Sequence, residues 1–184
     1  MRSLVAALVG LAASAGLAAC APPNTGVVEL AWVFVDCNGD PIFPGGVFSL
    51  DVPRDSCDLP GRTPDGTVRY DLHVELEMCD ATCEAGCQDP ECLVMPATRF
   101  ECDSSRGADR EVPASEDPYQ FTLRAVIEAP SGECTDPDPS CISVPGPRER
   151  LVTEGLVTDL QVYQIAVDVR SDSSPLDLEA CGCA

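Results

Sequence analysis

The chain has 184 residues, of which 31 are acidic and 11 are basic, so its net charge is −20 at pH 7. A surface this acidic repels nucleic-acid phosphates and anionic lipid headgroups, which argues against nucleic-acid binding and against peripheral adsorption to anionic membranes. Twelve cysteines are several times the usual share, which favours a disulfide-containing domain outside the cytoplasm.

The N-terminus has the layout of a secretory signal peptide over residues 1–19, because Arg2 is followed by an apolar run from residue 4 to residue 19. That run is shorter than the ~20 residues that a membrane-spanning helix needs. It ends in Leu17-Ala18-Ala19-Cys20, which resembles the bacterial lipobox. The resemblance implies cleavage before Cys20 and acyl chains, palmitate among them, on that cysteine. Residues 20–26 then form a lipidated tether. Because Ala21 and not aspartate follows Cys20, we expect the outer membrane, on its periplasmic or cell-surface face.

Six strands are predicted in the rest of the chain, and helical periodicity is absent. Their ranges are 27–35, 47–52, 68–78, 98–102, 119–129 and 156–169. The segments between them, including 60–66 and 104–109, are rich in Pro and Gly and are interpreted as turns. Residues 27–170 are therefore expected to form an antiparallel β-sandwich of about seven strands, followed by a C-terminal tail over 171–184 that is polar and loose from Ser171 to Leu178.

Alternation within the strands predicts which side chains face the core. The inward sets are Val28, Leu30, Trp32 and Phe34; Phe48, Leu50 and Val52; Tyr70, Leu72, Val74, Leu76 and Met78; Phe100; and Tyr119, Phe121, Leu123, Ala125 and Ile127. The alternation of the last strand slips near Gln161-Val162-Tyr163, which predicts a β-bulge.

The strand order also resembles that of Cys-rich surface lipoproteins of myxobacteria and related deltaproteobacteria. The resemblance is carried by Leu30-Ala31-Trp32-Val33-Phe34, Phe100-Glu101-Cys102, Tyr119-Gln120-Phe121-Thr122-Leu123 and Leu156-Val157-Thr158-Asp159-Leu160. It covers about residues 27–169 and implies a transthyretin-like (carboxypeptidase-regulatory-like) sandwich with no catalytic residues. From alternation alone, an immunoglobulin-like sandwich fits equally well.

With Cys20 lipidated, eleven cysteines remain, so at least one is expected to lack an intrachain partner. They are Cys37, Cys57, Cys79, Cys83, Cys87, Cys92, Cys102, Cys134, Cys141, Cys181 and Cys183. The four in the insertion at 79–92 are expected to form two local disulfides in one of three pairings, with a zinc site as the alternative. We expect Cys134–Cys141 and Cys37–Cys57 bridges, and a bond from Cys102 to Cys181 or Cys183. The stiffened insertion is the expected place for a binding surface.

Catalytic chemistry has few candidates. His73 is the only histidine and falls on the polar face of its strand, where we expect it to face solvent. Asp36, Asn38 and Asp40 begin like a calcium loop, but Asn-Gly-Asp-Pro is more simply a tight turn. We therefore expect no cofactor, no small-molecule substrate and no enzyme activity. The expected role is envelope-structural or protein interaction, and the alternatives are an extracellular calcium-binding module and a carboxylate-dependent hydrolase.

Overall fold

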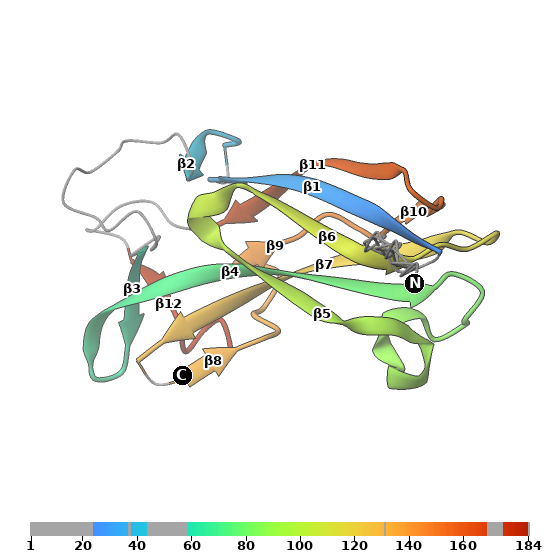
Figure 1. The fold of residues 1–184 in the computed structure, drawn as a ribbon. Helices are drawn as coiled ribbons and strands as arrows, with labels where there is room; N and C mark the ends of the chain where they lie inside the picture. The colour runs from blue at the N-terminus through green and yellow to red at the C-terminus, as the bar shows by residue number, and fades with distance from the viewer. Residues whose placement is uncertain (1–23, 37, 44–58, 131, 169–174, 184) are drawn as a thin grey trace, which may run out of the picture.

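The computed structural model describes residues 24–36, 38–43, 59–130, 132–168 and 175–183, and these form an all-β sandwich of two sheets (Figure 1). The predicted fold class is thus confirmed. The expected strand at 47–52 lies outside the described residues. In the described part, no helix is long and apolar enough to span a bilayer.

The first sheet has the strand order β2–β1–β11–β9, and β6 pairs with β1 beside β2. Its strands are β1 (Thr25–Val35), β2 (Pro41–Phe43), β6 (Arg106–Pro113), β9 (Ile142–Ser143) and β11 (Val157–Val167). The second sheet has the order β10–β7–β4–β3–β12, with β5 on β4 and β8 on β7. Its strands are β3 (Leu59–Thr63), β4 (Gly66–Asp80), β5 (Leu93–Glu101), β7 (Tyr119–Ala129), β8 (Gly132–Cys134), β10 (Arg148–Arg150) and β12 (Leu176–Asp177). Short 3-10 helices occupy Gly86–Gln88 (η1), Pro90–Cys92 (η2) and Cys102–Ser104 (η3).

The core lies between the inward faces of β1, β4, β7 and β11, where alternate side chains leave water. The inward residues predicted on β1 and β4 are all buried, and so are those on β7 except Tyr119, which is half-buried. Trp32, Tyr70 and Tyr163 are the largest fully buried side chains. Phe100 is half-buried and packs on Trp32, with 5.7 Å between the ring centroids.

The direction of one central pairing differs from the expectation, because β1 and β11 run parallel. β12 and β3 are also parallel, while the other pairings are antiparallel. Alternation determines which side chains share a face, but it does not determine a strand's neighbour or its direction. The predicted bulge is confirmed: the register slips as Glu29 pairs with Asp159 and Ala31 with Val162, and Gln161 has φ +65°.

Two segments that were interpreted as turns are largely strands, because only residues 64–65 of the first form a turn and β6 begins at Arg106 in the second. β3 contains Pro60 and Gly61, and a Cβ on Gly61 would lie 2.9 Å from the Tyr70 ring and 3.1 Å from Leu178, so glycine permits this close packing. β6 shows little apolar alternation, since Val112 is its only buried residue, and its backbone bonds to β1 define it. Residues that pair along the margin of a sheet need no apolar pattern, and for that reason the sequence did not reveal them.

The C-terminal tail is also more ordered than expected. The side chains of Leu176, Leu178, Cys181 and Cys183 are all buried. β12 pairs with β3 beside an Arg62–Asp177 ion pair of 2.6 Å. The expectation of a loose segment is therefore wrong for residues 175–178, because Leu176 and Leu178 pack into the core, and Cys181 and Cys183 attach the residues that follow.

Candidate interaction surface

The Cys-rich insertion leaves β4 and returns through β5, and two interleaved disulfides hold it. Cys79 pairs with Cys87 and Cys83 pairs with Cys92, with Cα atoms 5.3 and 5.9 Å apart. The expected pair of local disulfides is thus present, and none of these sulfurs is left as a thiolate for zinc. The Asp80 carboxylate accepts hydrogen bonds from the Thr82 amide and hydroxyl, which lower the pKa of Asp80. Two disulfides and these hydrogen bonds thus hold a short segment that has no large apolar side chain.

An open groove of about 520 Å³ runs beside this insertion, on the outer face of the second sheet. It is lined by Gln120, Thr122 and Arg124 of β7, by residues 85–88 of the insertion and by Asp136. The Thr122 hydroxyl lies 3.4 Å from the Cys87 sulfur, so the insertion sits directly on the sheet. The groove presents amides, a hydroxyl and a guanidinium, which suits polar recognition better than an apolar ligand.

Two arginines organise the charges on the same sheet face. Arg124 joins Glu77 of β4 (2.7 Å) to Asp136 in the loop after β8 (3.0 Å). Arg99 of β5 joins Glu75 of β4 (2.8 Å) to Glu133 of β8 (2.6 Å). The hydrogen bond with Glu133 has the largest effect on the pKa of Arg99 and that with Glu75 the next largest, and both raise it. Arg99 in turn lowers the pKa of Glu133. These pairs connect β4, β5, β7, β8 and the loop after β8 across one face of the sheet.

His73 lies on this face but does not face solvent as expected, since only 6% of it is exposed. Its Nε2 is 2.8 Å from Glu128 on β7, and its Nδ1 is 3.1 Å from Glu101 on β5. The Nδ1 contact is not aligned as a hydrogen bond. Because β4 pairs with β5 on one side and β7 on the other, each neighbouring strand places one glutamate beside the imidazole. No nucleophilic Ser or Cys is among these partners, and the imidazole lies between the carboxylates of Glu101 and Glu128.

The calcium-like segment forms a tight turn. The Asp36 carboxylate accepts hydrogen bonds from the amides of Asp40 (2.9 Å) and Asn38 (2.8 Å) and from the Asn38 side chain (3.0 Å). These bonds, that from Asp40 foremost, lower the pKa of Asp36. Across the described residues, no group of three or more His, Cys, Asp or Glu side chains is arranged to hold a metal ion.

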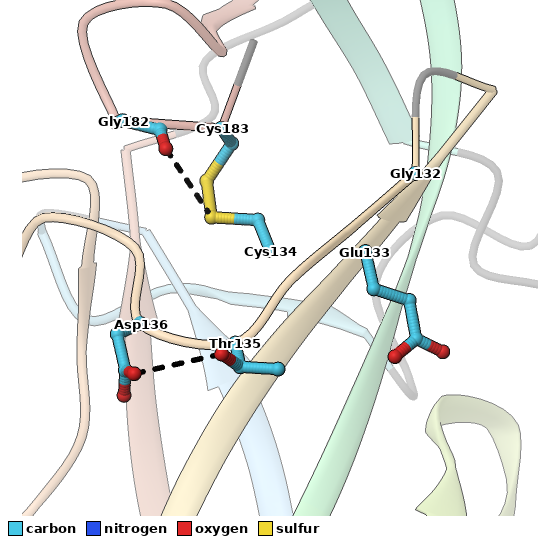
Figure 2. Close-up of a pocket in the computed structure, with 7 residues that line it drawn as sticks. All are labelled: Gly132, Glu133, Cys134, Thr135, Asp136, Gly182 and Cys183. Carbon is cyan, nitrogen blue, oxygen red and sulfur yellow. Dashed lines mark hydrogen bonds between the residues drawn. A yellow bond between two sulfur atoms is a disulfide. The ribbon is translucent and has the colours of Figure 1, made fainter.

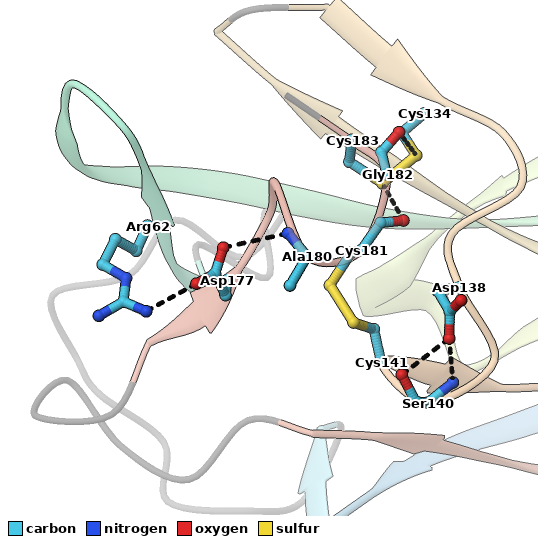
Figure 3. The surroundings of a disulfide bond; sticks show 10 residues. All are labelled: Arg62, Cys134, Asp138, Ser140, Cys141, Asp177, Ala180, Cys181, Gly182 and Cys183. Carbon is cyan, nitrogen blue, oxygen red and sulfur yellow. Dashed lines mark hydrogen bonds and ion pairs between the residues drawn. A yellow bond between two sulfur atoms is a disulfide. The ribbon is translucent and has the colours of Figure 1, made fainter.

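The C-terminal disulfides differ from those expected. Cys141 pairs with Cys181, and Cys134 pairs with Cys183, with Cα atoms 5.8 and 5.1 Å apart (Figure 3). The predicted Cys134–Cys141 bond is wrong, and so is a bond from Cys102 to either tail cysteine; Cys102 is disulfide-bonded elsewhere. Cys134 and Cys141 are thus each bonded to a cysteine of the tail and not to one another. The predicted Cys37–Cys57 bond lies outside the described residues.

A second open pocket, of about 380 Å³, lies where this C-terminal segment meets β8 (Figure 2). Glu133 and Asp136 contribute its charged groups, and the Cys134–Cys183 disulfide forms part of its wall. Asp138 positions the loop nearby: its carboxylate accepts from the Ser140 amide and hydroxyl, and its own amide donates to the Cys181 carbonyl oxygen. Asp136 also lines the groove, so the two openings are neighbours.

The sequence led us to expect a binding surface at the Cys-rich insertion, but it did not identify the β7 residues and Asp136 that line the groove beside it. The signal in the sequence was the pair Glu75 and Glu77 on the polar face of β4, because opposite charges on neighbouring strands pair favourably with such carboxylates. Arg99 and Arg124 are the cations that the structure brings there. Comparisons of the chain with protein-family models, curated proteins and solved structures yield no match.

Proposed function

We propose that this chain is an exported lipoprotein, held on the outer membrane by acyl chains on Cys20, with an envelope-structural or protein-interaction role and no catalytic one. The observation that carries the proposal is the oxidation state of the cysteines. All nine cysteines that the structure describes are in disulfides, and such bonds persist in oxidising compartments outside the cytoplasm. Together with the Leu17-Ala18-Ala19-Cys20 sequence, they support an exported and anchored protein.

The anchorage is tested by the mass of the full chain isolated from membranes of a lipoprotein-processing bacterium. We expect a mature protein that begins at Cys20 and carries diacylglycerol and a further acyl chain. The matched variant Cys20→Ala should accumulate as an unprocessed precursor without lipid. An unmodified Cys20 in a protein that is released to the periplasm would contradict the proposal.

The groove beside the Cys-rich insertion supports the protein-interaction role. Its walls are held by two disulfides and by the Arg124 ion pairs, so it is formed before any partner arrives. A preformed polar groove lowers the ordering cost of binding an extended polar segment of another envelope protein. Partner recognition there would use the side chains of Gln120, Thr122 and Arg124.

The interaction role is tested by photo-crosslinking in living cells. A benzoylphenylalanine at Gln88, on the groove wall, should give one defined adduct with an envelope protein. The control site is Asp65, an exposed residue in the turn between β3 and β4, where we expect no adduct. If the Gln88 variant gave no adduct, the groove would not be a partner site, and the envelope-structural role alone would stand.

A further inference from the structure

The loop between β10 and β11 carries an unusual share of exposed apolar surface. Among the described residues, four large hydrophobic side chains are strongly exposed: Leu151, Leu156, Val157 and Val162, at 48, 58, 58 and 55%. The first three lie on or beside this one loop. Single exposed apolar residues are ordinary on protein surfaces, but several gathered on one loop commonly mark a contact surface.

This loop is fixed to the start of β1. The Val27 amide donates to the Leu156 carbonyl oxygen, and the Gly155 amide donates to the Thr25 carbonyl oxygen, both at 2.9 Å. The contact is so close that a Cβ on Gly26 would lie 2.7 Å from the Thr153 carbonyl oxygen and 2.8 Å from Val152. The chain that enters β1 therefore cannot change its position without moving the loop.

The position of the loop places it next to the anchor. Cys20 precedes Thr25 by five residues, which reach at most about 18 Å even when fully extended. In Figure 1 the start of β1 and the β10–β11 loop lie at one end of the sandwich, and β8 and β12 lie toward the other. Acyl chains on Cys20 would hold the apolar loop within reach of the bilayer surface.

We propose that Leu151, Leu156 and Val157 form a membrane-docking surface that inserts into the headgroup boundary of the bilayer holding the Cys20 lipid; this rests on the proposed lipidation. The occupant is lipid because the five-residue connection brings the loop to the membrane. Apolar contact carries the docking, since Glu154 on the same loop and the net charge of −20 both oppose attraction to anionic lipid. The anchor then holds the domain in one orientation, with the C-terminal disulfides toward the far end.

The test uses the full lipidated chain in phosphatidylcholine vesicles that contain brominated acyl chains, which quench tryptophan on contact. The variant Leu156→Trp places the reporter on the loop. The matched control is Val162→Trp, at an equally exposed position further along β11. The native Trp32 is buried and gives a constant background emission, which is measured on the parent protein and subtracted. The mass of each sample is measured first, so that unlipidated protein, which would count against the proposed function, is recognised separately.

For lipidated protein we expect bromine to remove most of the emission that Leu156→Trp adds, and to leave that of Val162→Trp unchanged. If bromine removed the same fraction of the added emission in both variants, or none in either, the proposal would be overturned. The loop would then be no closer to lipid than the rest of the strand. A blue shift at residue 156 without bromine quenching would also overturn it, since a second copy of the chain or another protein would then cover the loop.

Discussion

At the scale of single residues, Gly107 shows how closely the margins of the two sheets approach. A Cβ at this position would overlap the ring of Phe100, which itself packs on Trp32. We expect Gly107→Ala to lower the free energy of unfolding by about 1–3 kcal/mol, because the ring must leave its place against the core. Urea denaturation measures the change. Gly146→Ala is the matched control, since no atom lies within 4 Å of a Cβ there, and an equal loss at both glycines would contradict the packing argument.

Asp138 provides a pH-dependent contribution at the same scale. Its hydrogen bonds from the Ser140 amide and hydroxyl lower its pKa below the ordinary value of 3.8. The unfolded carboxyl therefore takes up a proton at a higher pH than the folded one. Its contribution to stability is complete above the unfolded pKa and is lost as the pH falls through the folded pKa.

Asp138→Asn keeps an acceptor oxygen but cannot titrate. We expect the stability of this variant to decline less steeply than that of the parent protein as the pH is lowered from about 6 to about 2. Denaturant unfolding at a series of pH values measures both slopes. Identical slopes would mean that Asp138 does not carry the acid dependence assigned to it.

At the scale of secondary-structure elements, the bulge in β11 depends on Gln161, whose φ of +65° is costly for a residue with a Cβ. Gln161→Gly should raise the free energy of unfolding by up to about 1 kcal/mol, because glycine adopts this conformation readily. Gln164 is the same residue type on the same strand, paired in regular register with Val33. Gln164→Gly should lower stability by about 0.5–1 kcal/mol. Changes of the same sign at both positions, in thermal or urea unfolding, would rule out conformational strain at Gln161.

The bulge also has a partner in the opposite sheet. Arg148 of β10 donates to the carbonyl oxygens of Leu160 and Val162, and its guanidinium lies 3.7 Å from the centroid of the Tyr163 ring. A bulge leaves backbone carbonyl oxygens to which no neighbouring strand donates a hydrogen bond. Arg148 satisfies two such groups and thereby connects the two sheets at their margin.

The C-terminal disulfides form a coupled pair, which gives a prediction for their removal. The Cys134–Cys183 and Cys141–Cys181 bonds span 49 and 40 residues. When one bond is present, the other closes only a small ring, so the loop-closure entropy of the long segment is already lost. By the chain-entropy relation, removing either bond should cost about 3 kcal/mol, and removing both about 7 kcal/mol. Paired Cys→Ser variants in urea denaturation test this, and strictly additive losses would show that the two bonds act independently.

The sequence predicted the strands whose alternating apolar side chains are buried. It missed the strands that are defined by backbone hydrogen bonds to a neighbouring strand. Alternation identified the inward faces of β1, β4 and β7, and its slip located the bulge at Gln161. It gave no sign of the parallel β1–β11 pairing or of β6, where backbone bonds and not apolar side chains define the strand. The prediction of the C-terminal disulfides failed for the same reason, because the tail that carries Cys181 is placed by the pairing of β12 with β3.

At the scale of the whole molecule, the dominant property is negative charge. The acidic residues outnumber the basic ones by 31 to 11. The observed ion pairs of Arg62, Arg99 and Arg124 neutralise only a few carboxylates, and pairs that are largely exposed contribute about 0–1 kcal/mol each. Repulsion among the remaining carboxylates therefore opposes the compact state, and the disulfides and the apolar core offset it.

This balance predicts the response to salt. Raising NaCl from about 0.01 M to about 0.3 M shortens the screening length from about 30 Å to less than about 8 Å. If repulsion outweighs the ion pairs, the melting temperature should rise, and about 1 kcal/mol corresponds to roughly 2–4 °C in a chain of this size. A fall would mean that the arginine pairs dominate.

Calcium chloride and magnesium chloride at matched ionic strength extend the test: general screening gives equal shifts of the melting temperature for the two divalent cations. A larger rise with calcium alone, reversed by a chelator, would instead favour a calcium-binding module, because only a specific site distinguishes ions of equal charge by size.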